Sequence, residues 1–138
     1  MKIFIYDQAK VHQQGYFPSD VDETQMYVIG GMYLQWLVDN RLVNEWFIHE
    51  TPDSLFEALH HKENTPLALY EYWRGQLVSD MLTEEGNAFS LFYYPQYHQD
   101  FREVFSYAHT PYHVLFTWER YENMAHKITQ TYSIWREQ

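Results

Sequence analysis

Four polar residues are the first candidates for chemistry in this 138-residue chain: Asp7, His12, Asn87 and His113. A carboxylate, an amide and two imidazoles can bind a small polar ligand, or transfer a proton, when they converge around an aromatic pocket. This set predicts a small-molecule-binding protein or an enzyme, which we keep as the alternative function. The hypothesis requires the four side chains to meet in one concave site.

The eight histidines have no spacing that specifies a metal site. His109 and His113 are four residues apart, as in a zinc-binding helix, but Thr110-Pro111 is a helix start that leaves His109 outside the helix. His60 and His61 are adjacent and cannot share one face of a helix. We therefore expect no metal ion and no cofactor.

The sequence contains no motif for nucleophilic catalysis. The absence of cysteine excludes thiolate chemistry and disulfides, and the serines lie in no G-x-S-x-G or S-x-x-K pattern. Asp80, Glu84 and Glu85 lie near an expected helix start, where negative charge is favoured, and Gly86 follows without the alternating oxygen ligands of a calcium loop. We expect no catalytic residue and classify the protein as a non-enzyme.

The net charge of -10 opposes binding to nucleic acid and to anionic membranes, because both require a basic surface. Residues 41–90 hold nine acidic residues and only three basic ones, with aromatic residues among them. An acidic surface with aromatic anchors can steer a basic protein and then hold it. The candidate partner-binding residues are Glu45, Trp46, Glu50, Asp53, Glu57, Glu71, Tyr72, Asp80, Glu84 and Glu85.

Two other interpretations of this composition stay open. The carboxylates can simply keep the protein in solution while the aromatic rings lie in the core. The chain can also be a self-associating subunit, which would require a large apolar patch on its surface.

The sequence also predicts a cytoplasmic protein. The apolar start at residues 3–6 reaches Asp7 before the roughly 7–15 apolar residues that a signal peptide needs. The longest apolar run, residues 26–38, contains Gln35 and is shorter than the ~20 residues that cross a bilayer. The lack of cysteine agrees with a reducing compartment.

The expected fold is all-α: a single domain over residues 1–138, with a compact bundle of about five to seven helices around a central apolar helix at residues 23–39. Gly30-Gly31 within that helix predicts the close approach of a neighbouring helix. Residues 1–22 are expected to be irregular or weakly extended. A long final helix is predicted from an apolar stripe with steps of three or four. Its members are Val114, Trp118, Tyr121, Ala125, Ile128, Tyr132 and Trp135.

Thr-Pro pairs predict three helix starts, because threonine caps a helix and the fixed φ of proline suits its first turn. The pairs are Thr51-Pro52, Thr65-Pro66 and Thr110-Pro111. Thr83 gives a fourth and weaker start, because Gly86 stands where a capping box has Glu or Gln. Any helix after Thr83 is expected to stop before Pro95, and a separate helix to follow at about residues 96–107.

Short motifs along most of the chain resemble a family of small bacterial proteins known only as a domain of unknown function. These are Tyr6-Asp7 with His12 and Phe17-Pro18, Gly31-Met32-Tyr33-Leu34-Gln35-Trp36, Glu85-Gly86-Asn87-Ala88-Phe89, and Tyr112-His113 with Thr117-Trp118. The chain departs from the family pattern at Val11, where that pattern has an aromatic residue. The resemblance implies a compact domain and carries no established activity.

Small acidic proteins of this kind are often encoded beside bacterial toxins. The resemblance therefore implies an immunity-type protein. Together with the charge distribution, it leads to the first functional hypothesis: the chain binds a basic toxin domain through its acidic, aromatic segment and neutralises it.

Overall fold

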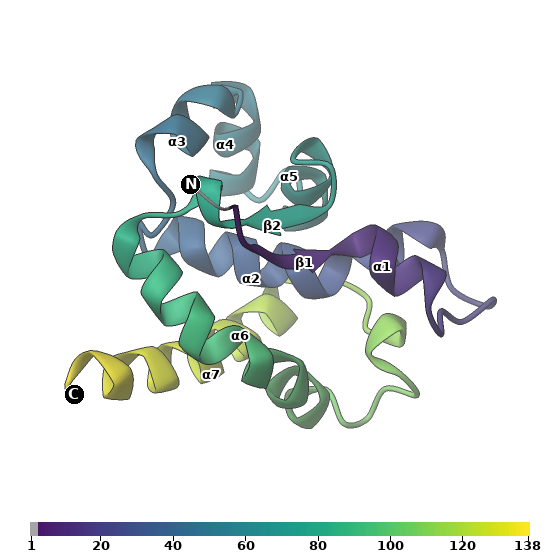
Figure 1. Ribbon diagram of the computed structural model, residues 1–138. Helices are drawn as coiled ribbons and strands as arrows, with labels where there is room; N and C mark the ends of the chain where they lie inside the picture. Colours follow the sequence, from purple (N-terminus) through teal and green to yellow (C-terminus); the bar gives the residue numbers. More distant parts are fainter. Residues whose placement is uncertain (1–2) are drawn as a thin grey trace.

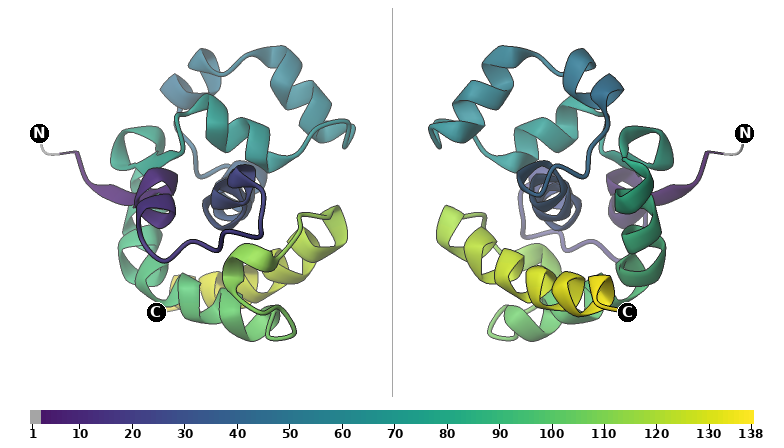
Figure 2. Two further views of the ribbon diagram at one scale, coloured as in Figure 1. Left: turned by 90° about the vertical axis from the view of Figure 1, so that its right-hand side faces the viewer. Right: turned by 90° about the vertical axis from the view of Figure 1, so that its left-hand side faces the viewer.

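The predicted apolar helix lies at the centre of the computed structural model, which describes residues 3–138. It begins as a 3-10 helix, η1 (Glu23–Tyr27), and continues as α2 (Val28–Asp39). Every residue from Val28 to Leu37 is buried, because almost no polar side chain interrupts this stretch. Helices α3, α4 and α5 lie on one side of α2, and α6 and α7 lie on the other (Figure 1). Figure 2 looks along α2 and shows these helices around it.

Seven α-helices and one small sheet make up the described part of the chain. The prediction of a mostly helical bundle of five to seven helices around a central one is confirmed. Besides α2, the helices are α1 (Ala9–Gln14), α3 (Glu45–Glu50), α4 (Asp53–His60), α5 (Pro66–Tyr72), α6 (Glu84–Val104) and α7 (Trp118–Arg136). The remaining elements are the strands β1 (Ile5–Gln8) and β2 (Gln76–Val78) and the 3-10 helices η2 (Ser79–Met81) and η3 (Pro111–His113).

The N-terminal segment is extended over β1, as predicted, and then forms the short helix α1, which the sequence pattern did not predict. Strand β1 pairs antiparallel with β2, so each strand satisfies backbone groups of the other. This pairing brings the N-terminal segment across the middle of the molecule, where it lies in front of α2 (Figure 1).

The glycine pair in α2 receives α5, as predicted. A Cβ on Gly31 would lie 3.1 Å from the carbonyl oxygen of Pro66, and one on Gly30 would lie 2.5 Å from Cζ of Tyr70. Any larger residue at either position would therefore force α5 outward. The stability that glycine costs inside a helix is offset by this close packing of two buried helices.

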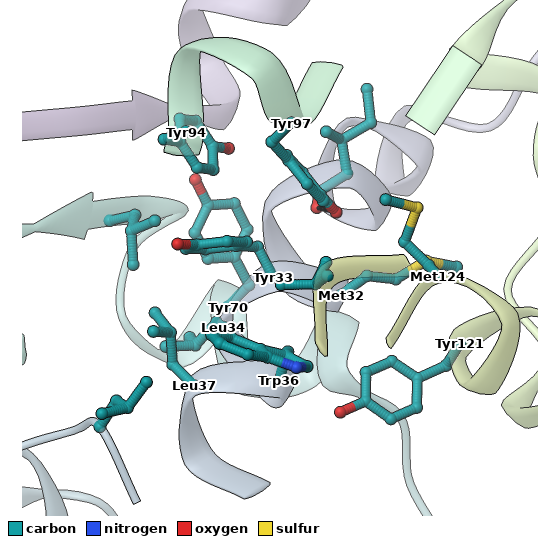
Figure 3. Close-up of a cluster of buried hydrophobic side chains, with 14 of the residues drawn as sticks. Met32, Tyr33, Leu34, Trp36, Leu37, Tyr70, Tyr94, Tyr97, Tyr121 and Met124 are labelled. Carbon is teal, nitrogen blue, oxygen red and sulfur yellow. Dashed lines mark hydrogen bonds between the residues drawn. The ribbon is translucent and has the colours of Figure 1, made fainter. Parts of the chain in front are cut away.

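Tyrosines and one tryptophan form much of the core (Figure 3). The ring of Tyr33 contacts the rings of Trp36, Tyr94 and Tyr97, with centroids 4.9–6.0 Å apart. A buried hydroxyl of such a ring usually has a hydrogen-bond partner. Tyr33 finds one in the Ser90 hydroxyl at 2.9 Å, and Tyr97 donates to the carbonyl of Ile29 at 2.6 Å.

The helix starts at the Thr-Pro pairs follow the sequence signals with one correction. Helix α5 begins at Pro66 and α4 begins one residue after Pro52, but Pro111 starts only the single 3-10 turn η3. The long final helix begins at Trp118 instead, because the hydroxyl of Thr117 caps it by accepting a hydrogen bond from the Arg120 N–H at 3.0 Å. The predicted apolar stripe faces the core from Trp118 to Trp135, whereas its first predicted member, Val114, is buried but lies before the helix.

Helix α6 does not stop before Pro95, so that prediction is wrong. One helix runs from Glu84 to Val104, and Thr83 caps it by accepting a hydrogen bond from the Gly86 N–H at 3.0 Å. Pro95 lies on the exposed face of the helix, together with Leu91, whose carbonyl loses its intrahelical donor. Water can hydrate that carbonyl, while Tyr93, Tyr94 and Tyr97 on the other face hold the helix against the core.

None of the helices described over residues 3–138 is long and apolar enough to cross a membrane.

Candidate functional site

Asp7 and His12 form a close polar pair at the surface end of the aromatic core. The distance from Asp7 Oδ1 to His12 Nε2 is 2.7 Å, and the two side chains are only 9% and 17% exposed. The imidazole of His98 stacks on that of His12, with ring centroids 5.5 Å apart. We call this arrangement of Asp7, His12 and His98, with Tyr94 and Tyr112 around them, the histidine pocket.

Two tyrosine hydroxyls fix the pair in place. The Tyr94 hydroxyl donates to Asp7 Oδ2, and the Tyr112 hydroxyl lies 2.7 Å from His12 Nδ1. The Gln8 N–H donates to Asp7 Oδ1 at 2.8 Å. The carboxylate and the imidazole are therefore both held at two positions, which restricts their rotation.

The small sheet and the start of α1 position Asp7 and His12. Asp7 pairs with Leu77 across the sheet, and the Ala9 N–H then donates to the carbonyl of Gly75 at 2.7 Å. This bond turns the chain from strand into helix directly after Asp7. His12 follows within α1 and reaches back to the carboxylate.

Helix α6 supplies the other side of the pocket. Tyr94 and His98 are four residues apart on it and therefore lie on one face. Tyr112 comes from η3, where the Thr110 hydroxyl accepts a hydrogen bond from the Tyr112 N–H. A cavity of about 340 Å³ opens beside these groups, with Arg102 at its wall.

The pocket combines an ionised carboxylate with a neutral imidazole. Burial disfavours the charge on Asp7, but the hydrogen bonds of His12 and Tyr94 outweigh it and hold the pKa of Asp7 below its usual value. Burial lowers the pKa of His98 from 6.5, so this imidazole is neutral at pH 7. A neutral imidazole beside a carboxylate can accept a proton or bind a metal ion.

The four residues proposed from the sequence do not meet as one set. Asp7 and His12 do, but Asn87 accepts a hydrogen bond from the Tyr6 hydroxyl at 2.6 Å and donates to the Ser79 carbonyl at 3.0 Å. His113 points to Asp20, with 3.0 Å between Nε2 and Oδ1. Both are tied to structural partners outside the pocket.

Sequence reasoning missed Tyr94, His98 and Tyr112 as members of the pocket. The spacing of Tyr94 and His98 on one helix was a usable signal, but the expected break at Pro95 placed them on different helices. Tyr112 appeared only within the resemblance, with no role of its own. Its contact with His12 spans a sequence separation of 100 residues, which no local pattern reveals.

A second candidate site lies in the acidic segment. We call it the aromatic groove: a cavity of about 600 Å³ lined among others by Trp46, Glu50, Tyr72, Trp73, Arg74 and Met81. Trp46 and Tyr72 are each 49% exposed, which is unusual for such large side chains. Trp46 also borders an adjoining cavity of about 490 Å³ lined by Glu45, Ile48 and His49.

All ten candidate partner-binding residues are exposed, but they do not all lie in the aromatic groove. Trp46, Glu50 and Tyr72 line the groove, and Glu45 lines the adjoining cavity. Glu71 and Asp80 directly precede the lining residues Tyr72 and Met81. Glu85 is engaged elsewhere, because it accepts a hydrogen bond from Tyr132 and lies 3.8 Å from the Arg136 guanidinium. The other three, Asp53, Glu57 and Glu84, line neither cavity.

The model of a family described as a domain of unknown function (DUF7832) matches residues 5–114 of the chain. This protein belongs to the DUF7832 family. This match confirms the family resemblance seen in the sequence. Of the motifs that carry the resemblance, Thr117-Trp118 lies beyond the matched segment. No curated protein and no solved structure matches the chain.

Both candidate sites lie within the DUF7832 segment. It contains the whole histidine pocket, from Asp7 to Tyr112, and the whole aromatic groove, from Trp46 to Met81. Helix α7 follows the segment and packs against α2 and α6, so it completes the core without contributing to either site.

Proposed function

We propose that this DUF7832 protein is a cytoplasmic immunity-type protein that binds and neutralises a basic bacterial toxin through the aromatic groove. The observation that carries the proposal is the exposed ring of Trp46, which lies between two cavities with carboxylates around it. Exposed aromatic rings in preformed hollows are the usual anchors of protein interfaces.

The groove is rigid before any partner arrives. The ring of Trp46 packs edge-on against Trp73 at 5.2 Å, and Trp73 stacks on the buried ring of Phe47 at 4.7 Å. The indole N–H of Trp73 donates to the Thr51 hydroxyl at 2.9 Å, and the Tyr72 hydroxyl donates to the carbonyl of Glu50. Binding therefore orders few side chains, which reduces its entropic cost.

The charges around the groove favour a basic partner. Glu45, Glu50, Glu71 and Asp80 are exposed at or beside the lining residues, whereas Arg74 is a basic residue of the wall. Carboxylates at the rim attract a basic surface during diffusion and align it. The aromatic rings then supply the apolar contact that retains it.

The test uses purified toxin domains encoded by genes adjacent to this one. We expect one of them to bind with an association rate that falls as salt is added. Trp46→Ala should weaken the affinity at least about tenfold, mainly through faster dissociation. Reversing Glu45, Glu50 and Glu71 to lysine should slow association and reduce its salt dependence.

Two matched variants outside the groove serve as controls. Tyr107→Ala removes another exposed aromatic ring, and Glu122→Lys reverses another exposed charge. Neither should change affinity or protection of cells that express the toxin. If no adjacent product binds, or if Trp46→Ala binds as the wild type does, the immunity proposal is wrong.

The histidine pocket supports a second candidate function, which is binding or conversion of a small polar ligand. The supporting observation is the 2.7 Å pair of Asp7 and His12 beside a cavity of about 340 Å³ whose wall includes Arg102. A screen of small carboxylates and phosphate esters by thermal shift would test this function. A ligand of the pocket must lose its effect in His98→Phe, and a screen without any such ligand would count against this candidate.

A further inference from the structure

We infer that Asp7, His12 and His98 bind one divalent transition-metal ion, such as Zn²⁺. Each residue offers one ligand atom, and the three atoms lie within 4.8 Å of one another. One carboxylate oxygen and two imidazole nitrogens suit zinc and the neighbouring first-row metals. The inference gives the histidine pocket a ligand and shares that site with the second candidate function, whereas it is independent of the aromatic groove.

The hydrogen bonds around the three residues are those that a metal site requires. Tyr94 holds Asp7 Oδ2, so the carboxylate presents Oδ1 as a single ligand atom. Without metal, His12 Nε2 and Asp7 Oδ1 share a hydrogen bond; when a metal ion binds, the Tyr112 oxygen can accept the proton of His12 Nδ1, which frees the lone pair of Nε2 for the ion. The ion then takes the place of the Nε2 proton between two atoms that lie 2.7 Å apart.

The ring of His98 packs against Tyr94 and Tyr97, with centroids 5.2 and 5.8 Å apart, but its nitrogens have no polar partner among the described residues. It makes no hydrogen bond there, although its ring is partly buried and stacks on His12. His98 lines the cavity together with His12, so its ring nitrogens can bind water or an ion there. Coordination would give it that partner.

Entry of the ion requires the three ligand atoms, which lie within 4.8 Å of one another, to move to the spacing of ligands around one metal ion. Two ligand atoms that each lie about 2.0–2.1 Å from one metal ion in a tetrahedral site are about 3.3–3.4 Å apart. Asp7 Oδ1 and His12 Nε2 are 2.7 Å apart and must separate by several tenths of an ångström. Side-chain rotation of His12 at the edge of the cavity can supply this movement.

The three ligands leave coordination positions open, as in catalytic metal sites rather than structural ones. Those positions face the cavity whose wall includes Arg102 and Thr110. A small anion or a water molecule can therefore reach the ion, with the Arg102 guanidinium near it. The metal would therefore form part of a ligand-binding site and would not serve mainly to stabilise the fold.

The experiment is a titration of the chelator-treated protein with CoCl₂, followed by visible absorption, and with ZnCl₂, followed by calorimetry. We expect one ion per chain with a dissociation constant below about 10 μM, and a thermal midpoint that rises with added Zn²⁺. His98→Phe should weaken binding at least about tenfold, because it removes one ligand but retains a ring of similar shape. Tyr112→Phe should weaken it about tenfold through loss of the contact that orients His12.

Controls separate this site from other histidines and from misfolding. His109→Gln disrupts the close pair of His109 and His113, whose rings are 5.4 Å apart, and should leave metal binding unchanged. His98→Phe should retain the far-ultraviolet circular dichroism and metal-free thermal midpoint of the wild type, because no hydrogen bond is lost. Asp7 is not substituted, since it also holds Tyr94 and the Gln8 N–H.

Absence of binding up to about 1 mM metal, or full binding by His98→Phe, would overturn the inference. Loss of binding in His109→Gln would also overturn it, because the ion would then lie at the pair of His109 and His113. Trp46→Ala should bind metal as the wild type does, so failure of the immunity proposal leaves this result unaffected. An organic ligand that binds the pocket of the chelator-treated protein, with no metal effect, would support the second candidate and reject the metal.

Discussion

Gly30 of α2 lies against the ring of Tyr70 from α5, and a Cβ at position 30 would come within 2.5 Å of Tyr70 Cζ. Tyr70 is fully buried and cannot move aside. We expect Gly30→Ala to lower the free energy of unfolding by about 1–3 kcal/mol despite the better helix propensity of alanine. Urea unfolding measures this. Gly15→Ala is the control, because its Cβ would meet no atom closer than 3.5 Å.

Tyr70 and Tyr97 provide a matched pair for testing buried hydroxyls (Figure 3). The Tyr70 hydroxyl is buried and has no hydrogen-bond partner among the described residues, whereas Tyr97 donates to Ile29 at 2.6 Å. Tyr70→Phe should leave stability unchanged or raise it by up to about 1 kcal/mol, and Tyr97→Phe should lower it by about 1 kcal/mol. Equal losses in the two variants would mean that Tyr70 does have a partner.

Stability should fall steeply in alkaline solution. Burial raises the pKa of Tyr33, Tyr70, Tyr93 and Tyr97 above 10, the value for a free tyrosine. Below pH 10 the folded and the unfolded chain both keep these hydroxyl protons, so the free energy of unfolding is not reduced. Above pH 10 the unfolded chain releases protons that the folded state retains, so each group lowers the unfolding free energy by about 1.4 kcal/mol per pH unit.

Four such groups predict cooperative unfolding between about pH 10 and 12. The measurement compares tyrosinate absorbance with far-ultraviolet circular dichroism during an alkaline titration. Most tyrosinate should form together with the loss of helix. Ionisation of nearly all tyrosines while the helix signal persists would show that these hydroxyls are accessible in the folded protein.

We expect the N-cap at Thr83 to contribute more to the free energy of unfolding than Thr65 at the start of α5. Thr83 accepts a hydrogen bond from the Gly86 N–H, whereas the Thr65 side chain makes no capping bond. We expect Thr83→Ala to lower the free energy of unfolding by about 1 kcal/mol, Thr83→Ser to restore most of it, and Thr65→Ala to cost less. Chemical denaturation of the three variants checks this order, which a larger loss in Thr65→Ala would refute.

Pro95→Ala should stabilise the protein. The proline interrupts the hydrogen bonding of α6 on its exposed face, and alanine would restore the donor to the Leu91 carbonyl. We expect a gain of about 1–3 kcal/mol in the free energy of unfolding, whereas Gln99→Ala, at a nearby exposed position, should stay within about 0.5 kcal/mol. A loss of stability in Pro95→Ala would indicate that the proline fixes a bend that the core requires.

The sequence by itself determined the elements whose signals are local. Three local patterns each extend over only a few helical turns, and the structure has all of them. They are the nearly continuous apolar stretch of α2, its glycine pair and the apolar stripe of α7. The same reasoning failed at Pro95, because a local rule for proline takes no account of which face of the helix is exposed. The packing of Tyr93 and Tyr97 against the core keeps α6 continuous through Pro95.

The two candidate sites depend on tertiary structure to different degrees. The acidic and aromatic residues of the groove are close in sequence, so composition pointed to that segment before the structure showed the hollow around Trp46. The histidine pocket joins β1, α1, α6 and η3, and its residues meet only because strand pairing and helix packing bring distant segments together. Periodicity and capping act over a few residues, whereas the proximity of Asp7 to His98 depends on the packing of the whole domain.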